Sequence, residues 1–592
     1  MVGRAATTWA EWLLPPLIAL AVLVVFGPAL RFGFVGWDDD KVFETNEAIR
    51  GFDPRRWHWM WTTFFMGHWH PLTWISIALD YRLWGLDARG YHLTNVVVHV
   101  VNALLVYLLA RRLIVLGFDE RRPGPTALAL GAGAAALLFA VHPLRVESVV
   151  WATERRDVLS GALLMAAVLA YLRAVQPRQA ALRSPVWYLA AVGLLAASLL
   201  AKAWGMTLPV VLLILDIYPL RRLGGRSIEW FRGGRARVLI EKTPFVLLAV
   251  AAALIAWRAQ SETPFGTMPL QRHGLTARTA QAFYGVAFYP LRTLVPKDLS
   301  PLYEIPRDLN PFAREYVLAA MVAAGLTAAA VGLRRRLPAF SATWATYLVI
   351  VAPVLGVAQS GPQFVADRYS YLSCLSFAVV AGGGLCALLD RPSSGRRAPR
   401  TLAGAGVYSV LLVFAVLAHR QTYFWQDSPT LWARVLSLSP ESVMANSNLG
   451  THYIERQDWR RAEPYLRRAT ELDPTWGAAW HNLGYSLYRQ KRYEEALAAY
   501  RAGQSVSPIP GDTLMAIGNC LYELGRLEEA LPVFREAAAF PELTVKAHCN
   551  IGLCLRGLGR FEEALDAYDA ALRHAPEYSA ALAGRALAQQ RR

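Results

Sequence analysis

The chain has 592 residues, of which 55% are hydrophobic and 18% are charged, and its formal net charge is +17 at pH 7. This composition is too apolar for a water-soluble enzyme of this size and indicates a polytopic membrane protein. The basic residues fall in short loops between apolar runs, so we expect membrane lipids, and no nucleic acid, as partners of this charge. The five cysteines form no CxxC pair, which disfavours a disulfide framework or a zinc site.

Apolar runs long enough to cross a membrane recur up to about residue 420. The first is predicted to be a retained helix, since no clear cleavage site of small residues accompanies it. A shorter run at 281–295 holds Pro290 and is predicted to be a re-entrant or interfacial helix. We expect eleven full spans, at 12–30, 92–110, 126–142, 157–175, 186–202, 204–220, 243–258, 315–333, 339–357, 370–390 and 401–419.

The loops between these runs alternate in basic charge, which predicts their orientation. With eleven spans, the C-terminal region lies on the outer side with the less basic loops. The alanine- and arginine-rich composition is typical of a bacterial chain, so we expect an inner-membrane protein with a periplasmic C-terminal region. The predicted cytoplasmic loops are 111–122, 173–183, 221–242, 334–336 and 391–400, and the predicted outer loops are 31–91, 142–157, 258–314 and 358–369.

The first outer loop opens with WDDDKVFETN (37–46), a compact acidic cluster beside the membrane. Asp38 and Asp39 are the best candidates for catalytic carboxylates, because a carboxylate at the bilayer edge can take a proton from an acceptor hydroxyl. The alternatives are oxygen ligands for a divalent cation and a plain solvated loop. The loop also carries seven of the chain's 20 tryptophans, which predicts that it lies on the membrane surface.

The second outer region, HPLRVESVVWATERRDVLS (142–160), is short but rich in ionisable residues. Arg155 and Arg156 lie at the mouth of the next span, where guanidinium groups can hold a phosphate. The alternative reading is a set of structural ion pairs. In HWHPLT (68–73) two histidines are two positions apart, which is too weak a spacing to predict a metal site.

Two further ionisable spots lie at predicted span ends, where charge near lipid is costly and therefore points to function. One is Lys202 in AKAWGMTLP, and the other is the pair Asp367–Arg368 in FVADRYSYLS. Arg368 is a candidate ligand for a lipid phosphate.

A 34-residue period begins after about residue 436 and is typical of tetratricopeptide repeats. About four repeats predict a stacked α-solenoid whose concave face can bind an extended peptide or a partner helix. We therefore expect a membrane domain at 1–420, a linker at 421–436 and a repeat domain at 437–592. The period is carried by Gly450, Gly484, Gly518 and Gly552, by Ala462, Ala496, Ala530 and Ala564, and by Pro474, Pro508 and Pro576.

The order of these motifs, from FVGWDDDKVFETN through HWHPLTWISIALDY, FAVHPLRVESVVWATERRDVLS, AKAWGMTLP and ADRYSYLS to the repeats, resembles the transmembrane and tetratricopeptide-repeat protein O-mannosyltransferases and their bacterial relatives. These belong to the GT-C class of membrane glycosyltransferases, and the resemblance covers nearly the whole chain. It implies an all-α GT-C-type domain that takes a sugar from a polyprenyl-phosphate carrier on the outer face. The family's motifs match Asp38 and Asp39, then His142, Glu147, Arg156 and Asp157, and finally Asp367 and Arg368.

We expect an inverting transfer of a sugar, mannose in the family's defined members, to a protein Ser/Thr hydroxyl. Asp38 or Asp39 is the expected base, and the repeats are expected to hold the acceptor. The alternatives are a ligase or polymerase with a diphosphate-lipid donor and a non-catalytic repeat scaffold. The expected donor-phosphate ligands are Arg155, Arg156, Lys202 and Arg368, and the expected supporting residues are His70, His142, Glu147, Asp157 and Asp367.

Overall fold

A computed structural model of the chain describes residues 9–118, 121–223, 230–262, 273–307, 309–356, 361–391 and 398–591. Parts of several predicted loops lie outside these residues, in particular in the basic loops 221–242 and 391–400 and in the outer loops 258–314 and 358–369. The chain divides into two compact units, Met1–Leu431 and Trp432–Arg592. The division falls inside 421–436, the stretch expected to be a linker, and most of that stretch is helical.

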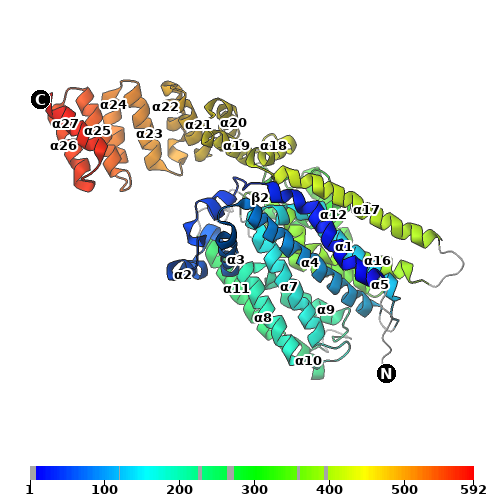
Figure 1. The fold of residues 1–592 in the computed structure, drawn as a ribbon. Coiled ribbons are helices and arrows are strands. Elements are labelled where there is room, and N and C mark those ends of the chain that lie inside the picture. Colours follow the sequence, from blue (N-terminus) through cyan, green and yellow to red (C-terminus); the bar gives the residue numbers. More distant parts are fainter. Residues whose placement is uncertain are drawn as a thin grey trace. The chain divides into compact units, whose positions relative to one another are not determined.

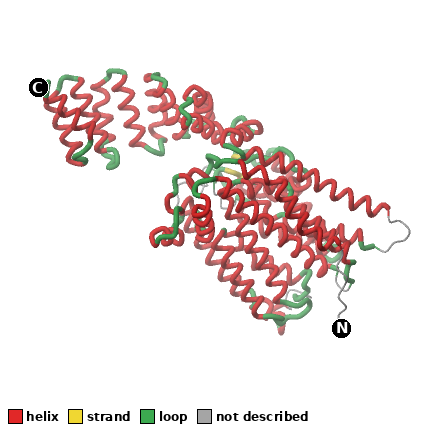
Figure 2. Tube along the Cα trace, in the orientation of Figure 1, coloured by secondary structure: helices red, strands yellow, loops and turns green. Residues whose placement is uncertain are grey.

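The described residues of the first unit are mostly helical (Figures 1 and 2). One two-stranded antiparallel sheet pairs β1 (Tyr303–Glu304) with β2 (Gln363–Val365). The helices are α1 (Trp9–Phe26), α2 (Pro54–Thr62), α3 (Pro71–Trp84), α4 (Ala88–Gly117), α5 (Pro125–Ala140), α6 (Val146–Val150), α7 (Arg155–Ala174), α8 (Pro185–Ala201), α9 (Leu208–Ile217), α10 (Gly233–Ile240), α11 (Thr243–Ser261), α12 (Leu275–Leu294), α13 (Arg314–Gly332), α14 (Pro338–Val351), α15 (Ser370–Ser373), α16 (Leu375–Leu389) and α17 (Ala398–Thr422).

Short helical turns join these helices at the positions that matter for the site. The turn η2 (Asp40–Glu44) is a π-helical turn in the first outer loop. The others are 3₁₀ turns: η5 (Pro143–Arg145), η6 (Ala152–Glu154), η7 (Ala203–Thr207), η10 (Asp367–Tyr369) and η11 (Tyr423–Trp425).

All eleven predicted spans coincide with helices of the first unit. Six are long and apolar enough to cross a membrane: Trp9–Arg31, Ala88–Gly117, Ala152–Ala174, Gly234–Ser261, Arg314–Gly332 and Thr401–Trp425. Two more are helix pairs bent by 55° and 54°, Pro125–Ala140 with Pro143–Val150 and Asp367–Ser373 with Leu375–Leu389. The remaining three are shorter apolar helices, at Pro185–Ala201, Ala203–Ile217 and Pro338–Val354.

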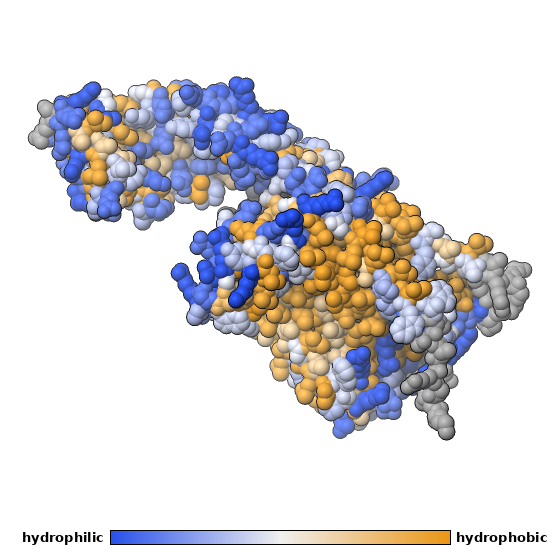
Figure 3. Space-filling model, viewed as in Figure 1, coloured by the Kyte–Doolittle hydropathy of each residue, from blue (hydrophilic) through white to orange (hydrophobic). Residues whose placement is uncertain are grey.

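On the face that Figure 3 shows, apolar side chains form a broad central band on the surface of the first unit. On α1, for example, Leu13, Leu17, Leu20 and Val24 are 45% or more exposed. A water-soluble unit would bury such a continuous surface, whereas lipid tails solvate it. The first unit is therefore an integral membrane domain.

Glycines let α5 and α16 approach each other closely. A Cβ atom on Gly131 would lie 2.5 Å from the carbonyl oxygen of Gly382, and one on Gly382 would lie 2.3 Å from that of Gly131. Small residues at crossing points are the usual means by which helices pack in lipid, where van der Waals contact replaces the hydrophobic effect.

The predicted outer loops meet at one end of the membrane domain. Thr153 of the second loop bonds Asp39 of the first, and Arg368 of the loop before α15 pairs with Glu147. The start of α18 (Ser428–Leu438) reaches the same end, because the Ser428 hydroxyl accepts the Gly36 N–H at 2.8 Å. The chain therefore leaves the first unit at the end that carries the aspartates.

The second unit is a stack of helix pairs with the predicted period. The marker prolines follow the second helix of a pair, whereas each marker glycine lies inside the first helix and faces a large side chain of the paired helix. A Cβ atom on Gly484 or Gly518 would lie 2.8 or 2.4 Å from the ring of Tyr500 or Phe534. The helices are α19 (Val443–Glu455), α20 (Trp459–Leu472), α21 (Gly477–Arg489), α22 (Tyr493–Gly503), α23 (Pro510–Glu523), α24 (Leu527–Ala537), α25 (Thr544–Gly557), α26 (Phe561–His574) and α27 (Ser579–Gln589).

Candidate active site

Asp39 is a buried anchor between the two outer loops. One carboxylate oxygen accepts the Val35 N–H at 3.0 Å, and the other accepts the Thr153 N–H and hydroxyl at 3.1 and 2.6 Å. The side chain is 0% exposed. Burial raises the pKa of Asp39 to about 7, although the hydrogen bonds from Thr153 and Val35 oppose this shift. With both oxygens engaged and no solvent access, Asp39 has no free position from which to accept a substrate proton.

Asp38 differs from its neighbour in that its carboxylate is half-buried and uncommitted. Among the described residues, none donates a hydrogen bond to its carboxylate. Burial raises the pKa of Asp38, whereas the Arg156, Lys41 and Arg368 cations lie close enough to lower it. The two adjacent aspartates therefore separate into a structural residue and a free one.

Glu154 is the centre of an ionic cluster that joins three predicted site cations. Its carboxylate lies 2.8 Å from Nη2 of Arg156, 3.0 Å from Nζ of Lys202 and 3.5 Å from Nε of Arg368. The side chain of Glu154 is 0% exposed, so these charges interact in a medium of low dielectric. The cluster unites residues that are up to 214 positions apart in the sequence.

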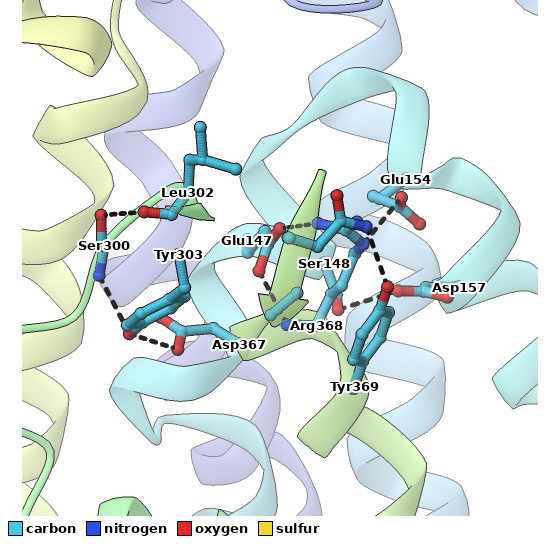
Figure 4. Close-up of polar contacts among 12 residues, drawn as sticks. Glu147, Ser148, Glu154, Asp157, Ser300, Leu302, Tyr303, Asp367, Arg368 and Tyr369 are labelled. Atoms are coloured by element: carbon cyan, nitrogen blue, oxygen red, sulfur yellow. Dashed lines mark hydrogen bonds and ion pairs between the residues drawn. The ribbon is translucent and has the colours of Figure 1, made fainter. Parts of the chain in front are cut away.

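Arg368 is fixed in this cluster by Glu147 (Figure 4). One Glu147 oxygen contacts Nη1 of Arg368, and the other accepts the Arg368 N–H at 2.8 Å. The guanidinium also lies over the Trp151 ring, at 5.5 Å from its centroid. The Glu147 carboxylate thus orients Arg368 by bonding both the guanidinium and the backbone N–H of that arginine.

Asp157 is a second carboxylate that holds Lys202. Its Oδ1 lies 2.5 Å from Nζ of Lys202 and accepts Nε1–H of Trp204 at 2.8 Å, and its Oδ2 accepts the Ser148 hydroxyl at 3.1 Å. Lys202 caps the end of α8 and is 20% exposed, which makes it the most accessible cation of the cluster. The break between α8 and η7 is what allows its side chain to turn toward α7.

Arg155 lies outside the cluster, although the sequence placed it beside Arg156. Its guanidinium is 1% exposed and is enclosed by Asp80 at 2.6 Å, Ser76 at 2.9 Å, the Tyr91 carbonyl at 2.9 Å and Asn95. Consecutive residues at the start of α7 point in directions about 100° apart, so Arg155 faces α3 and α4 while Arg156 faces Glu154. Arg155 therefore ties helices together and is not available to a donor phosphate.

Asp367 is buried beside the cluster and is held by the small sheet. Its Oδ1 accepts the Tyr303 hydroxyl at 2.9 Å, and the Ser300 N–H donates to the same tyrosine oxygen at 3.1 Å (Figure 4). The pairing of β1 with β2 brings Tyr303 to this position. The sequence offered no signal for Tyr303, because a two-residue strand has no periodicity to detect.

The predicted histidines occupy two different environments. His142 is buried, with Nε2 at 3.0 Å from the Thr293 carbonyl and Nδ1 accepting the Leu144 N–H at 3.2 Å. His70 is buried with its ring 4.6 Å from that of Trp74. Burial, reinforced by the Arg156 cation, lowers the pKa of His70 and brings that of His68 to about 3, so both rings are neutral at physiological pH. His68, which is not among the residues expected from the sequence, is the half-exposed member of the pair.

A divalent cation was an alternative use of the acidic residues. Within the described part of the chain, no group of three or more His, Cys, Asp or Glu side chains lies close enough to hold a metal ion. The acids of the cluster are instead interleaved with arginines and a lysine.

Three tryptophans from separate elements pack beside the aspartates. The Trp37 and Trp151 rings stack at 4.9 Å, and Trp425 of η11 lies 5.6 Å from Trp151 and 6.4 Å from Trp37. The tryptophans of the first loop predict that this loop lies on the membrane surface. For Trp37 the structure shows a contact within the protein that orders the backbone next to Asp38.

The fold and the site define a helical membrane protein with an ionic cluster at one end of its spans and a tetratricopeptide-repeat domain after them. Tetratricopeptide-repeat families match residues 447–513, 511–539 and 545–578. These matches and the helices confirm the predicted all-α class and the repeats.

The chain is similar to proteins of the family that its motifs resemble. It is 30% identical over 197 residues to "Protein O-mannosyl-transferase tmtc2" of Xenopus laevis, which is 32% of this chain and 22% of that protein. It is 24% identical over 497 residues to "Protein O-mannosyl-transferase TMTC3" of Mus musculus, which is 77% of this chain and 50% of that protein. The resemblance inferred from the motifs is thus confirmed, and the chain spans at most half the length of these two relatives.

Solved structures match in the repeats. The structure titled "Crystal structure of YrrB: a TPR protein with an unusual peptide-binding site" is 21% identical, with a TM-score of 0.26, and the match covers 28% of this chain and 84% of that chain.

Proposed function

We propose that the chain is a GT-C-type membrane glycosyltransferase that moves a sugar from a polyprenyl-phosphate carrier to a Ser/Thr hydroxyl of a protein. The single observation that carries this proposal is the uncommitted Asp38 carboxylate beside the Arg156, Lys202 and Arg368 cluster. A base and a set of cations close together are what a displacement at a sugar phosphate needs. Its similarity to proteins named protein O-mannosyl-transferases supports this class of reaction, with mannose as the first donor sugar to test.

The reaction is a single displacement at the anomeric carbon. The acceptor oxygen forms a bond to that carbon while the bond from the carbon to the phosphate oxygen breaks, which inverts the anomeric centre. Asp38 takes the proton of the hydroxyl. The polyprenyl phosphate leaves as a stable anion and therefore needs no proton.

The cluster cations stabilise the charge that develops on the leaving phosphate. Lys202 is 20% exposed and Arg156 is 11% exposed, so their donors are the most accessible to a ligand. Arg368 is 8% exposed, and Glu147 bonds both its guanidinium and its backbone N–H. Arg368 is therefore suited to fix the positions of Arg156 and Lys202. Glu154 and Asp157 hold these cations in place when no donor is bound.

The repeats offer a place for the acceptor chain. A hollow of about 260 Å³ lies between α21, α23 and α25 of the second unit. Its polar groups can bond a peptide backbone, and its aromatic and apolar walls can pack side chains. It is lined by His481, Tyr485, Tyr500, Asp512, Met515, Ala516, Asn519, Leu543 and Lys546.

The test is a transfer assay with the purified full chain, a radiolabelled polyprenyl-phosphate mannose and a membrane-protein extract. We expect the wild type to label protein and Asp38→Asn to lower the rate by at least about a hundredfold. Glu47→Gln is the matched control, because Glu47 lies in the same loop with its side chain 81% exposed. Equal rates for wild type and Asp38→Asn would remove Asp38 from the mechanism. Labelling from a diphosphate-linked glycan, but not from the monophosphate donor, would indicate the ligase reaction instead.

A further inference from the structure

The helix α12 lies along the loop that carries Asp367. The Tyr289 hydroxyl is 3.4 Å from the Ala366 nitrogen, and Gln281 Nε2 donates to the Phe364 carbonyl at 3.1 Å. Its last turn also contacts His142, whose Nε2 lies 3.0 Å from the Thr293 carbonyl. The end of this helix is therefore fixed against both outer loops that build the site.

Arg292 lies in that last turn and is an accessible arginine that no ion pair among the described residues engages. Its guanidinium is near enough to Asp367 and Tyr303 to interact with both electrostatically. Among the described residues, however, no carboxylate lies within 4.0 Å of it and no acceptor bonds it. Its guanidinium carbon lies 5.5 Å from the centroid of the Phe288 ring. The side chain is half-buried, so its donors can be reached by a ligand.

The other arginines around the site, and Lys202, are occupied or enclosed, whereas Lys41 beside Asp38 is exposed but has no guanidinium fork. Arg156, Lys202 and Arg368 already contact carboxylates. Arg145 also has no ion pair with a described residue, but it is 2% exposed and its guanidinium lies over the Phe139 and Tyr371 rings, whose faces offset part of its charge. Arg292 is thus the guanidinium whose five N–H donors are best placed to meet an incoming anion.

The surroundings of Arg292 indicate what kind of anion this is. Leu291, Leu294 and Val295 flank it and are 50%, 74% and 62% exposed. The 20-residue helix α12 is not among the described helices that are apolar enough to span a membrane. An accessible guanidinium at the end of an amphipathic helix, next to exposed aliphatic side chains, matches a ligand with a charged head and an apolar tail.

We propose that Arg292 binds the phosphate of an isoprenoid lipid, with Leu291, Leu294 and Val295 contacting the first units of its chain. This inference rests on the proposed function, because it names the side from which the donor reaches the cluster. Arginine suits the role, since its planar fork can bond two phosphate oxygens at once. The competing explanation is that Arg292 only complements the negative C-terminal end of α12, which would require no ligand.

The experiment measures binding of a fluorescent polyprenyl phosphate to the full chain in phosphatidylcholine nanodiscs, with the uncharged polyprenol as the paired probe. We expect Arg292→Gln to weaken polyprenyl phosphate binding on the order of tenfold and to leave polyprenol binding unchanged. Arg292→Lys should bind polyprenyl phosphate with an affinity between those of wild type and Arg292→Gln, because lysine keeps the charge but lacks the planar guanidinium fork. Arg335→Gln is the control, because Arg335 is an exposed arginine beyond the end of α13.

Several outcomes would overturn the inference. These are equal polyprenyl phosphate binding by Arg292→Gln and wild type, a parallel loss of polyprenol binding, or equal competition by phosphatidylglycerol or inorganic phosphate. The first means that Arg292 does not touch the phosphate, and the last that it is a general anion contact. If wild type transfers sugar and Arg292→Gln binds donor normally, only this inference fails. If wild type binds no polyprenyl phosphate, the proposed donor fails with it.

Discussion

The Asp39 carboxylate bonds both the N–H and the hydroxyl of Thr153, a residue 114 positions further along the chain. This contact locks the loop after α1 to the turn before α7. It therefore sets the position of Asp38, the next residue back, relative to Arg156. A carboxylate that looks catalytic in the sequence thus serves to hold its neighbour in place.

We expect Asp39→Asn to destabilise the membrane domain and to do so in a pH-dependent way. Burial raises the pKa of Asp39 to about 7, so between about pH 4 and 7 the folded protein holds a proton that the unfolded chain has released. The stability of the wild type therefore falls as pH rises through this window, by up to about 4 kcal/mol. Asparagine cannot titrate, and its amide cannot accept from all three donors, which costs about 1–3 kcal/mol.

The measurement is thermal unfolding of wild type and Asp39→Asn in detergent at pH 4 to 8. The loss of thermal stability in Asp39→Asn, relative to wild type, should be largest at pH 4 and should become smaller toward pH 7. A deficit that stays constant across the range would mean that Asp39 does not titrate there.

The pH dependence of transfer should report Asp38. A base acts in its ionised form, so the rate should rise with pH through the pKa of Asp38, which burial raises above its ordinary value. Arg156 is the largest of the effects that lower this pKa. Arg156→Gln should therefore move the rising limb to higher pH, in addition to reducing the maximum rate. If Arg156→Gln remains active and its rate rises over the same pH range as that of wild type, a group other than Asp38 controls this pH dependence.

The Glu147–Arg368 pair offers a test of the cluster's structural role. Glu147→Gln leaves the Arg368 guanidinium buried without its main counter-charge, and breaking a buried pair from one side typically costs about 3–5 kcal/mol. Glu147→Gln/Arg368→Met should recover part of this loss, because an apolar replacement removes the stranded charge. Thermal unfolding of both variants checks this, and transfer should be lost in each. A double variant less stable than the single one would show that Arg368 is stabilised by other contacts.

The repeat stack depends on glycines at helix contacts. Gly518→Ala places a Cβ atom 2.4 Å from the Phe534 ring, so the two helices of that repeat must separate. We expect a loss of about 1–3 kcal/mol, the usual cost of overpacking. Gly332→Ala is the control, since no atom lies within 4 Å of its added Cβ. Limited proteolysis and unfolding of the full chain measure the effect, and equal behaviour of the two variants would refute it.

The placement of Arg155 and Arg156 shows how much of the candidate site could be predicted from the sequence. Both residues are basic and begin the same helix, so no sequence pattern separates them. In the structure one is enclosed by Asp80 and the other faces Glu154. Asp38 and Asp39 present the same problem, because burial and donor geometry decide which carboxylate is free.

The sequence by itself determined the two-part architecture, the helices and the loops that hold the site. These follow from local physics: apolar run length matched to a bilayer, and a 34-residue period that leaves room for one helix to pack on the next. Only the tertiary structure decided which ionisable side chains contact one another and which of them hold helices together. It also placed Tyr303 and Arg292 near Asp367, in the loop before α15. Those outcomes depend on helix rotation and on contacts between residues far apart in the chain, and a single sequence records neither.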